Sequence, residues 1–389
     1  MKIAILCSDI TTLGGVEVVT MWLAGRFKNV YDAHVDIITC RSNNDGTINS
    51  LPDGVNILNL GIPNMQQYFR KYNYDVLEEL VHKNAYDYFV VQLSTAFKNL
   101  CIIADFEIYR RIFKYTKIYL VIHESPLYFL SRYNTDYDGA FKFLLKKIYS
   151  SVKYTPTVRK FFLESAKYVK QFVTLSNGCR KELKDNFGLD SIVRYNPYEF
   201  ISLEERIEDR KENIILCAGR LSKEKNLILL LTAWGKIKNH KEWKVRIVGS
   251  GDDSERLKRY VNQMKLFDVE FIGAVPHDKL MEYMQKSKVF VLPSFFEGFP
   301  TVICEAMNSK VAVITTHYDG FSDELIEDGK TGLVVDYKAE SLAAKLEELI
   351  NNNEKLLELQ NNGYNRCKEF FSVNNNWDFF SDKVFMGQN

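Results

Sequence analysis

The chain has 389 residues, of which 46% are hydrophobic and 26% charged, and this composition excludes a mainly disordered, collagen-like or disulfide-scaffold protein. Its 51 Lys and Arg and 50 Asp and Glu residues give a net charge of +1, which argues against a dedicated duplex-DNA binder, so no nucleic-acid partner is expected. The length predicts about two domains.

Short apolar runs alternate with helical patterns along the first half of the chain. Strands are predicted at residues 2–7, 35–39, 55–58, 88–91, 118–122, 172–175 and 192–195. Helices are predicted at residues 16–27, 65–81, 106–113, 141–149 and 158–169. This alternation predicts a parallel sheet covered by helices on both faces.

A polar segment at residues 202–213 is typical of a linker, and the same alternation then restarts. Strands are predicted at residues 214–218, 245–248, 269–272, 289–292 and 311–315, and helices at 227–237, 256–264, 279–285, 301–307, 342–350 and 355–370. The fold class is therefore predicted as α/β, with two doubly wound Rossmann-like domains, residues 1–196 and 197–372. Ligands of such sheets bind beyond the carboxyl ends of the strands, which predicts a cleft where the two domains face each other. An aromatic tail, residues 373–389, is expected to form a last helix that packs back on the first domain.

Basic residues gather at residues 141–184, which hold 11 Lys and Arg against 2 Asp and Glu among many apolar side chains. Two interpretations stay open. In the first, the stretch binds an anionic bilayer and brings the enzyme to a lipid-linked acceptor. In the second, it forms ordinary amphipathic helices with solvated lysines.

Seven scattered cysteines without a C-x-x-C pattern predict reduced thiols and a cytoplasmic location. If the basic stretch binds a bilayer, the expected place is the inner face of the cell membrane. No signal peptide or membrane span is expected, because no apolar core of a leader and no run of 18 apolar residues occurs. The cysteines and histidines show no metal-ligand spacing, so no metal site and no cofactor are expected.

The segment 293–305 is the most informative part of the chain. A strand ends at residue 292, a loop carries Glu297, and Pro300 suits the first position of a helix. The amides of Phe299, Thr301 and Val302 would then lack partners and form a site for a phosphate or diphosphate. A carboxylate would repel a phosphate, so Glu297 and Glu305 fit better as acceptors for sugar hydroxyls. The alternative is a plain helix start.

Two cations follow the first strand of the second domain, where ligands of such sheets bind. Arg220 and Lys225 in that loop would neutralise a diphosphate without a metal. The alternative is a solvated charged loop.

Three further positions lie after predicted strands. Gly15 permits close approach of the backbone to a ligand, with a helix behind it. His123 follows a strand and suits contact with a substrate hydroxyl or a proton relay. Gly249 and Gly251 would shape a nucleotide pocket. For each of these the alternative is a structural role: a tight turn for the glycines and a hydrogen-bonded histidine.

These motifs resemble those of the retaining glycosyltransferases of family 4, which have the GT-B fold. The resemblance spans nearly the whole chain and is strongest in the blocks AGRLSKEKN, VRIVGSGDD, VEFIGAVPHDKLMEYMQKSKVFVLPSFFEGFPTVICEAM and DGKTGLVVD. Glu297 and Glu305 match the E-x7-E signature of that family. In the first half only LGGVE and VIHESP are similar. An aromatic residue, Tyr198, departs from the family pattern after Asn196-Pro197.

The resemblance implies a role for each matched position. Glu297 would hold the donor sugar near its anomeric carbon, and Glu305 would bind the ribose hydroxyls. Arg220 and Lys225 would bind the diphosphate as it leaves. The remaining donor-site positions that it implies are Gly15, His123, Val275 (its backbone holding the base), Phe299, Pro300 (which has no N–H), Thr301 and Val302.

The predicted function is transfer of a sugar from a nucleotide-diphosphate sugar to an acceptor hydroxyl or a lipid-linked saccharide, with retention and without a metal. The enzyme would be a hexosyltransferase-type glycosyltransferase (EC 2.4) of bacterial surface polysaccharide biosynthesis, such as capsule, O-antigen or lipopolysaccharide. The alternative is a nucleotide-sugar-binding protein or a GT-B sugar epimerase without transferase activity. Two separated carboxylates also suit a glycosidase, but that enzyme needs no diphosphate site.

Overall fold

The structure, a computed structural model, describes residues 1–10, 15–41, 51–61, 71–93, 106–123, 126, 155–196, 198, 211–240, 242–295, 297–317 and 322–374. The chain divides into two compact units, Met1–Pro197 and Tyr198–Asn376. The helix predicted at 141–149, the first residues of the one predicted at 65–81 and most of the tail at 373–389 lie outside the described residues.

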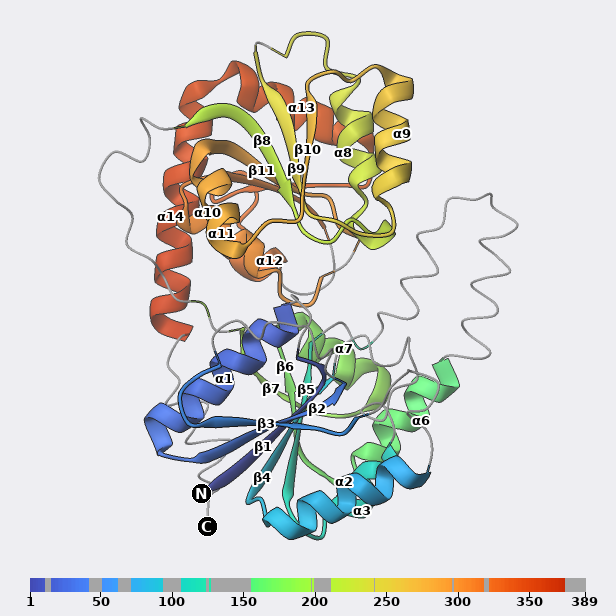
Figure 1. The fold of residues 1–389 in the computed structure, drawn as a ribbon. Coiled ribbons are helices and arrows are strands. Elements are labelled where there is room, and N and C mark those ends of the chain that lie inside the picture. The colour runs from blue at the N-terminus through green and yellow to red at the C-terminus, as the bar shows by residue number, and fades with distance from the viewer. Residues whose placement is uncertain are drawn as a thin grey trace. The chain divides into compact units, whose positions relative to one another are not determined.

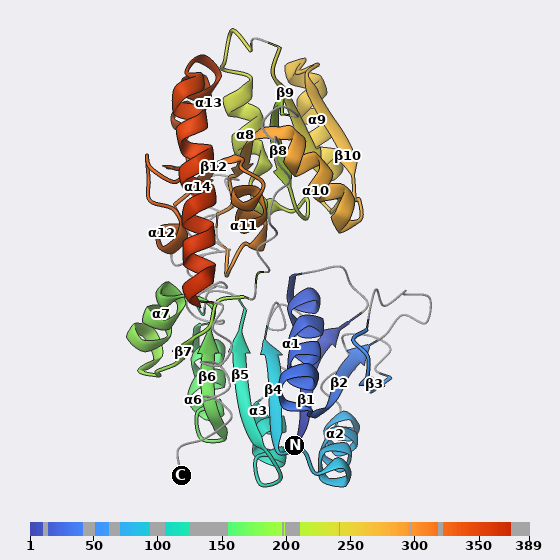
Figure 2. The same cartoon turned by 90° about the vertical axis from the view of Figure 1, so that its left-hand side faces the viewer.

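The first unit is built on one parallel sheet with the strand order β3-β2-β1-β4-β5-β6-β7. Its elements are β1 (Lys2–Asp9), α1 (Gly15–Tyr31), β2 (His34–Arg41), β3 (Val55–Asn59), α2 (Lys71–Asn84), β4 (Tyr88–Leu93), α3 (Phe106–Ile112), β5 (Lys117–Ile122), α6 (Thr155–Ser165), β6 (Val169–Thr174), α7 (Asn177–Phe187) and β7 (Ile192–Val193). The helix α1 covers one face of the sheet, and α2, α3 and α6 lie side by side on the other (Figures 1 and 2).

The second unit holds a six-stranded parallel sheet with the order β10-β9-β8-β11-β12-β13. Its elements are β8 (Glu212–Ala218), the short 3-10 helix η6 (Lys223–Lys225), α8 (Leu227–Trp234), β9 (Lys244–Val248), α9 (Ser254–Met264), β10 (Val269–Gly273), α10 (His277–Lys286), β11 (Ser287–Leu292), α11 (Thr301–Asn308), β12 (Ala312–Thr316), α12 (Ser322–Leu325), β13 (Leu333–Val335), α13 (Ala339–Asn351) and α14 (Asn353–Asn374). The helices α8, α9 and α13 cover one face, and α10, α11 and α14 cover the other (Figure 1).

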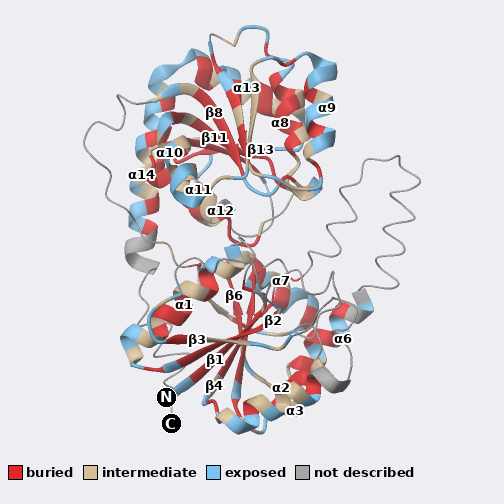
Figure 3. Ribbon diagram, viewed as in Figure 1, coloured by how far each residue is buried: buried red, intermediate tan, exposed pale blue. Residues whose placement is uncertain are grey.

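The central strands of both sheets are buried on both faces, as their continuous Val-, Ile- and Leu-rich sequences predict, whereas the edge strand β10 is half-buried (Figure 3). Ile3, Ile5, Val90 and Leu120 are fully buried in the first sheet, and their transfer from water is the main favourable contribution to its folding. The predicted fold class of two Rossmann-like α/β domains is confirmed.

Two predicted elements end earlier in the structure, and three elements of the structure were not predicted. The helix expected to reach residue 169 ends at Ser165, and Val169 begins β6 instead. The strand expected at 192–195 is shorter and ends at Val193. The pattern missed α7, whose sequence is mostly polar, and it also missed α12 and β13.

Candidate functional site

The loop after β8 and the loop after β11 lie beside each other, because these strands are neighbours in the second sheet. Parallel strands end at the same edge, so the two motifs meet there. The backbone N–H of Phe295 donates to the carbonyl of Glu224 at 2.9 Å and joins the two loops.

Lys225 and Glu297 form the centre of this edge. Lys225 Nζ lies 2.6 Å from Glu297 Oε1, and the hydroxyl of Ser294 donates to the same oxygen at 2.6 Å. The two charged side chains are 20% and 11% exposed. Ser294 is fully buried, and its own carbonyl accepts a hydrogen bond from the hydroxyl of Thr316. The Glu297 carboxylate is therefore held in place by two donors, one of them a cation.

Arg220 lies in the same loop, where its side chain is 62% exposed. Its guanidinium is 3.3 Å from the carboxylate of Glu224, four residues further along. An exposed pair of this kind contributes only about 0–1 kcal/mol, so an incoming phosphate could displace the carboxylate at little cost.

The start of α11 follows Glu297 after a short turn. Phe299 and Pro300 are buried, and the helix begins at Thr301. The amide of Ile303 donates to the carbonyl of Pro300 at 3.0 Å. The amides of Thr301 and Val302 belong to the first turn of α11, whose N–H groups have no carbonyl partners within the helix. Such N–H groups can bind an anion.

Glu305 lies one turn into α11, and its carboxylate is 3.1 Å from Nε2 of His277, the first residue of α10. No spacing in the sequence predicts this pair. The hydrogen bond that the imidazole donates to the Glu305 carboxylate raises the pKa of His277 above its ordinary 6.5, against a smaller effect of burial. Tyr198 also lies close to Glu305 and forms a hydrogen bond with Asn308, and burial raises the pKa of its phenol.

The raised pKa gives a testable pH dependence. A histidine with a raised pKa stabilises the fold below its unfolded pKa, and this stabilisation is lost as the pH rises through the folded pKa, above 6.5. We expect His277 to titrate above 6.5 by NMR and the Glu305→Gln variant to shift that midpoint down toward 6.5. The control is Glu282→Gln, which removes a carboxylate of α10 itself that pairs with Lys279 and not with His277. An unchanged midpoint in Glu305→Gln would contradict the pair.

Gly249 and Gly251, predicted to shape a nucleotide pocket, are required by the fold itself. A Cβ at Gly249 would lie 1.9 Å from the carbonyl oxygen of Gly219, and one at Gly251 would lie 2.3 Å from that of Leu221. Both glycines also have positive φ, at 136° and 158°. The absence of a Cβ at both positions lets the loops after β8 and β9 pack directly against each other. The fold therefore accounts for both glycines without a ligand.

The remaining predicted positions have fewer contacts. Gly15 begins α1 in the first unit, is exposed, and has nothing within 4 Å of a built Cβ, so the fold does not require a glycine there. Val275 is half-buried between β10 and α10. His123, also in the first unit, is 6% exposed, and burial lowers its pKa to about 4.

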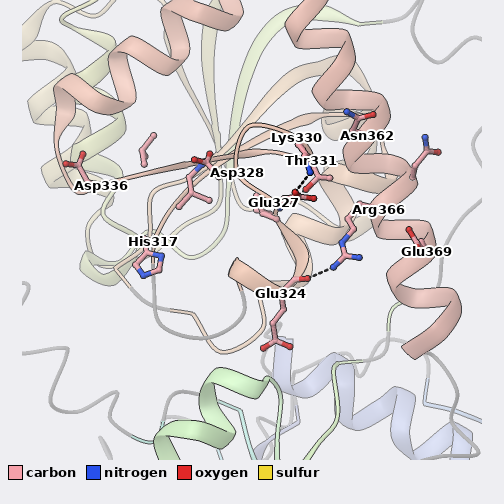
Figure 4. A pocket seen from close by; sticks show the side chains of 14 residues that line it. His317, Glu324, Glu327, Asp328, Lys330, Thr331, Asp336, Asn362, Arg366 and Glu369 are labelled. Atoms are coloured by element: carbon pink, nitrogen blue, oxygen red, sulfur yellow. Dashed lines mark hydrogen bonds and ion pairs between the residues drawn. The ribbon is translucent and has the colours of Figure 1, made fainter.

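A pocket of about 990 Å³ lies elsewhere in the second unit, around β13, α12 and α14 (Figure 4). None of the predicted site residues lines it. Five carboxylates surround it, against two cations, Lys330 and Arg366. Such a surface repels a diphosphate, so we place the candidate site at the Lys225–Glu297 edge.

Across the described ranges, no group of three His, Cys, Asp or Glu side chains is arranged to hold a metal ion. The helices that the structure describes include none with the length and apolar character needed to cross a bilayer.

Comparison with known proteins finds relatives for part of the chain. Residues 201–366 match the family model described as "Glycosyl transferases group 1". The "GalNAc-alpha-(1->4)-GalNAc-alpha-(1->3)-diNAcBac-PP-undecaprenol alpha-1,4-N-acetyl-D-galactosaminyltransferase" of Campylobacter jejuni is 37% identical over 45% of this chain, and the "Amylovoran biosynthesis glycosyltransferase AmsD" of Erwinia amylovora is 30% identical over 51% of it. The matched stretches cover 49% and 57% of these relatives, about half of their lengths.

Solved structures resemble the whole chain. HepE of Anabaena, in complex with UDP and glucose, has a TM-score of 0.75 at 16% identity, with 99% of this chain and 100% of that chain covered. Sucrose-phosphate synthase of Thermosynechococcus elongatus has a TM-score of 0.74 at 16% identity, with both chains fully covered. At this identity the likeness shows the fold alone. The chain thus has the two-domain fold of these glycosyltransferase structures, and its match to the glycosyl transferases group 1 model lies in the second unit.

Proposed function

We propose that the protein is a glycosyltransferase that moves a sugar from a nucleotide-diphosphate sugar to an acceptor hydroxyl. The observation that carries this proposal is the Lys225–Glu297 pair beside the start of α11. The arrangement offers cations and free amides to a diphosphate, and a fixed carboxylate to a sugar. The matched family and the two bacterial relatives support the same reading.

In this proposal the main chemical demand is stabilisation of the departing diphosphate. Arg220, Lys225 and the amides of Thr301 and Val302 supply positive charge where negative charge develops. Glu297 accepts from sugar hydroxyls, and Glu305 from the ribose. Because Lys225 already contacts Glu297, one lysine would link the sugar and diphosphate parts of the donor.

Several finer parts of the proposal rest on the resemblance to family 4. They are retention at the anomeric carbon, hexosyl transfer, independence of metal ions, and a role in bacterial surface polysaccharide biosynthesis. The printed names of the two relatives, one acting on an undecaprenol-linked glycan and one in amylovoran biosynthesis, support the last of these. The acceptor would then be a saccharide or a lipid-linked saccharide.

Contact with an anionic membrane through residues 141–184, at the inner face of the cell membrane, stays a prediction. The first part of that stretch lies outside the described residues. In the described part, α7 has Leu183 and Phe187 buried, which leaves its basic residues on the outer side of an ordinary amphipathic helix.

The test of the proposed function is the binding of nucleoside diphosphates, measured by thermal shift and by calorimetry. EDTA is present in both assays to remove free metal ions. A ligand at 100 times its Kd adds ~2.7 kcal/mol to the stability of the folded state. We expect stabilisation by at least one nucleoside diphosphate and a weaker effect of the matching monophosphate. Lys225→Ala should weaken binding by about 10-fold or more. The control is Lys244→Ala, which removes a lysine paired with Glu270.

A panel of nucleotide sugars then separates the alternatives. Release of free nucleoside diphosphate with an acceptor supports a transferase, whereas binding without release supports a nucleotide-sugar-binding protein. Change of the sugar without transfer supports an epimerase. No stabilisation by any nucleoside diphosphate would refute the donor site altogether.

A further inference from the structure

Two buried polar side chains occupy the carboxyl ends of neighbouring strands in the first unit. Gln92 is the second-last residue of β4, and His123 follows β5 directly. The strands pair in parallel, with Gln92 opposite Val121, so the two side chains reach the same edge of the sheet. Gln92 is 1% exposed and His123 is 6% exposed.

A hydrogen bond joins Nε2 of His123 to Oε1 of Gln92. A carboxamide oxygen only accepts, so the imidazole must carry its proton on Nε2. The backbone N–H of His123 also donates to the carbonyl of Leu93 at 2.9 Å. The strand β4 thus fixes both the position of the histidine and the nitrogen that bears the proton.

His123 is neutral at physiological pH. Burial lowers its pKa to about 4, and no charged group among the described residues contributes to that shift. A neutral imidazole with its proton on Nε2 has one acceptor left, Nδ1. No partner of Nδ1 is found within the described ranges.

The carboxamide of Gln92 is not explained by packing. Its Nε2 is buried and has no hydrogen-bond partner among the described residues. A buried donor without a partner is unfavourable, and a leucine of similar size would avoid it. Among the described residues, the imidazole of His123 is thus the one side chain to which the carboxamide of Gln92 is hydrogen-bonded.

We propose that Gln92 is a positioning residue for His123: it holds the proton of the imidazole on Nε2 and so leaves Nδ1 as an acceptor for a sugar or acceptor hydroxyl. This inference rests on the proposed function, since it needs a hydroxyl substrate. Gln92 acts through His123 and need not touch the substrate itself.

The first test reads the histidine directly and needs no substrate. In 15N-histidine NMR of the whole protein, with the His123 signals assigned from His123→Gln, we expect one tautomer with the proton on Nε2. Gln92→Leu should replace it with a mixture of tautomers. The control is Gln360→Leu, which removes another buried glutamine, one that donates to the carbonyl of Lys288 in the second unit.

The second test uses activity and pH. Gln92→Leu should lower kcat by about 10- to 100-fold at every pH, with KM for the donor changed less than about threefold. Gln92→Glu keeps an acceptor for Nε2 but raises the pKa of His123, so we expect activity to return only at alkaline pH. A merely structural role would instead lower the melting temperature and activity of both variants together, without moving the pH profile.

The two tests separate the two claims. If the wild-type protein transfers no sugar, the proposed function fails while the NMR result still stands. A wild-type His123 protonated on Nδ1, or a Gln92→Leu spectrum identical to that of the wild type, would overturn the positioning role whatever the activity.

Discussion

Alanine at Glu297 is expected to lower kcat for sugar transfer by about 100- to 1,000-fold, a loss typical of one removed stabilising group in an active site. The carboxylate is fixed by Lys225 and Ser294 at 2.6 Å each, so its removal takes away a pre-positioned acceptor for the sugar. Binding of the nucleoside diphosphate should stay within a few-fold of the wild type, because the cations and the α11 amides remain. Steady-state kinetics and calorimetry measure the two effects separately.

A matched carboxylate gives the control for this prediction. Glu270 on β10 pairs with Arg246 at 2.9 Å, and its replacement by alanine should leave kcat unchanged. Circular dichroism and thermal melting show whether each variant is folded. Transfer at the wild-type rate by a folded Glu297→Ala protein would remove Glu297 from the proposed mechanism.

The Gly249→Ala variant is expected to lose about 3 kcal/mol or more of unfolding free energy. The new Cβ would lie 1.9 Å from the backbone oxygen of Gly219, and the positive φ adds strain of its own. The neighbouring loop cannot yield easily, because the amide of Gly219 is bonded to Val248 and that of Leu221 to Ser250. Urea unfolding of the purified protein measures the loss.

Gly273→Ala is the matched control in the same unit. Gly273 also has a positive φ, 85°, but nothing lies within 4 Å of its built Cβ. Its replacement should therefore cost only the backbone strain, about 1–2 kcal/mol. Equal stability of the two variants would show that the loop contact is not rigid.

The strands were predictable because each is a short apolar run between turn residues. Ile214–Ala218 and Val289–Leu292 fall inside β8 and β11. Pro300 is the N-cap residue of α11, one position before the first helical position that the sequence predicts for it. The helix α7 was missed because most of its residues are polar. Its apolar positions Cys179, Leu183 and Phe187 recur every four residues, and Ser176 caps its start, so a signal was present.

The candidate site was predictable only in part. Loop positions of Arg220, Lys225 and Glu297 follow from the strand pattern, since ligands bind at the carboxyl ends of strands. The contact between Lys225 and Glu297 joins residues 72 positions apart and depends on β8 and β11 being neighbours.

Contacts between separate helices, or between separate strands, are harder to predict from the sequence. No spacing rule connects His277 with Glu305, or Gln92 with His123, because each pair comes from two separate elements. The functions of these residues depend on tertiary packing, which a single sequence does not specify.

The contact of Tyr198 with Asn308 and Glu305 has a consequence for recombining proteins of this kind. A chimera that joins a foreign first unit to the second unit of this chain would be most conveniently cut in the polar segment at 202–213. With that junction, position 198 would come from the foreign protein, and α11 would lose its contact with Tyr198. The crossover should instead be placed upstream of Tyr198, so that the tyrosine is inherited together with the helix that carries Glu305.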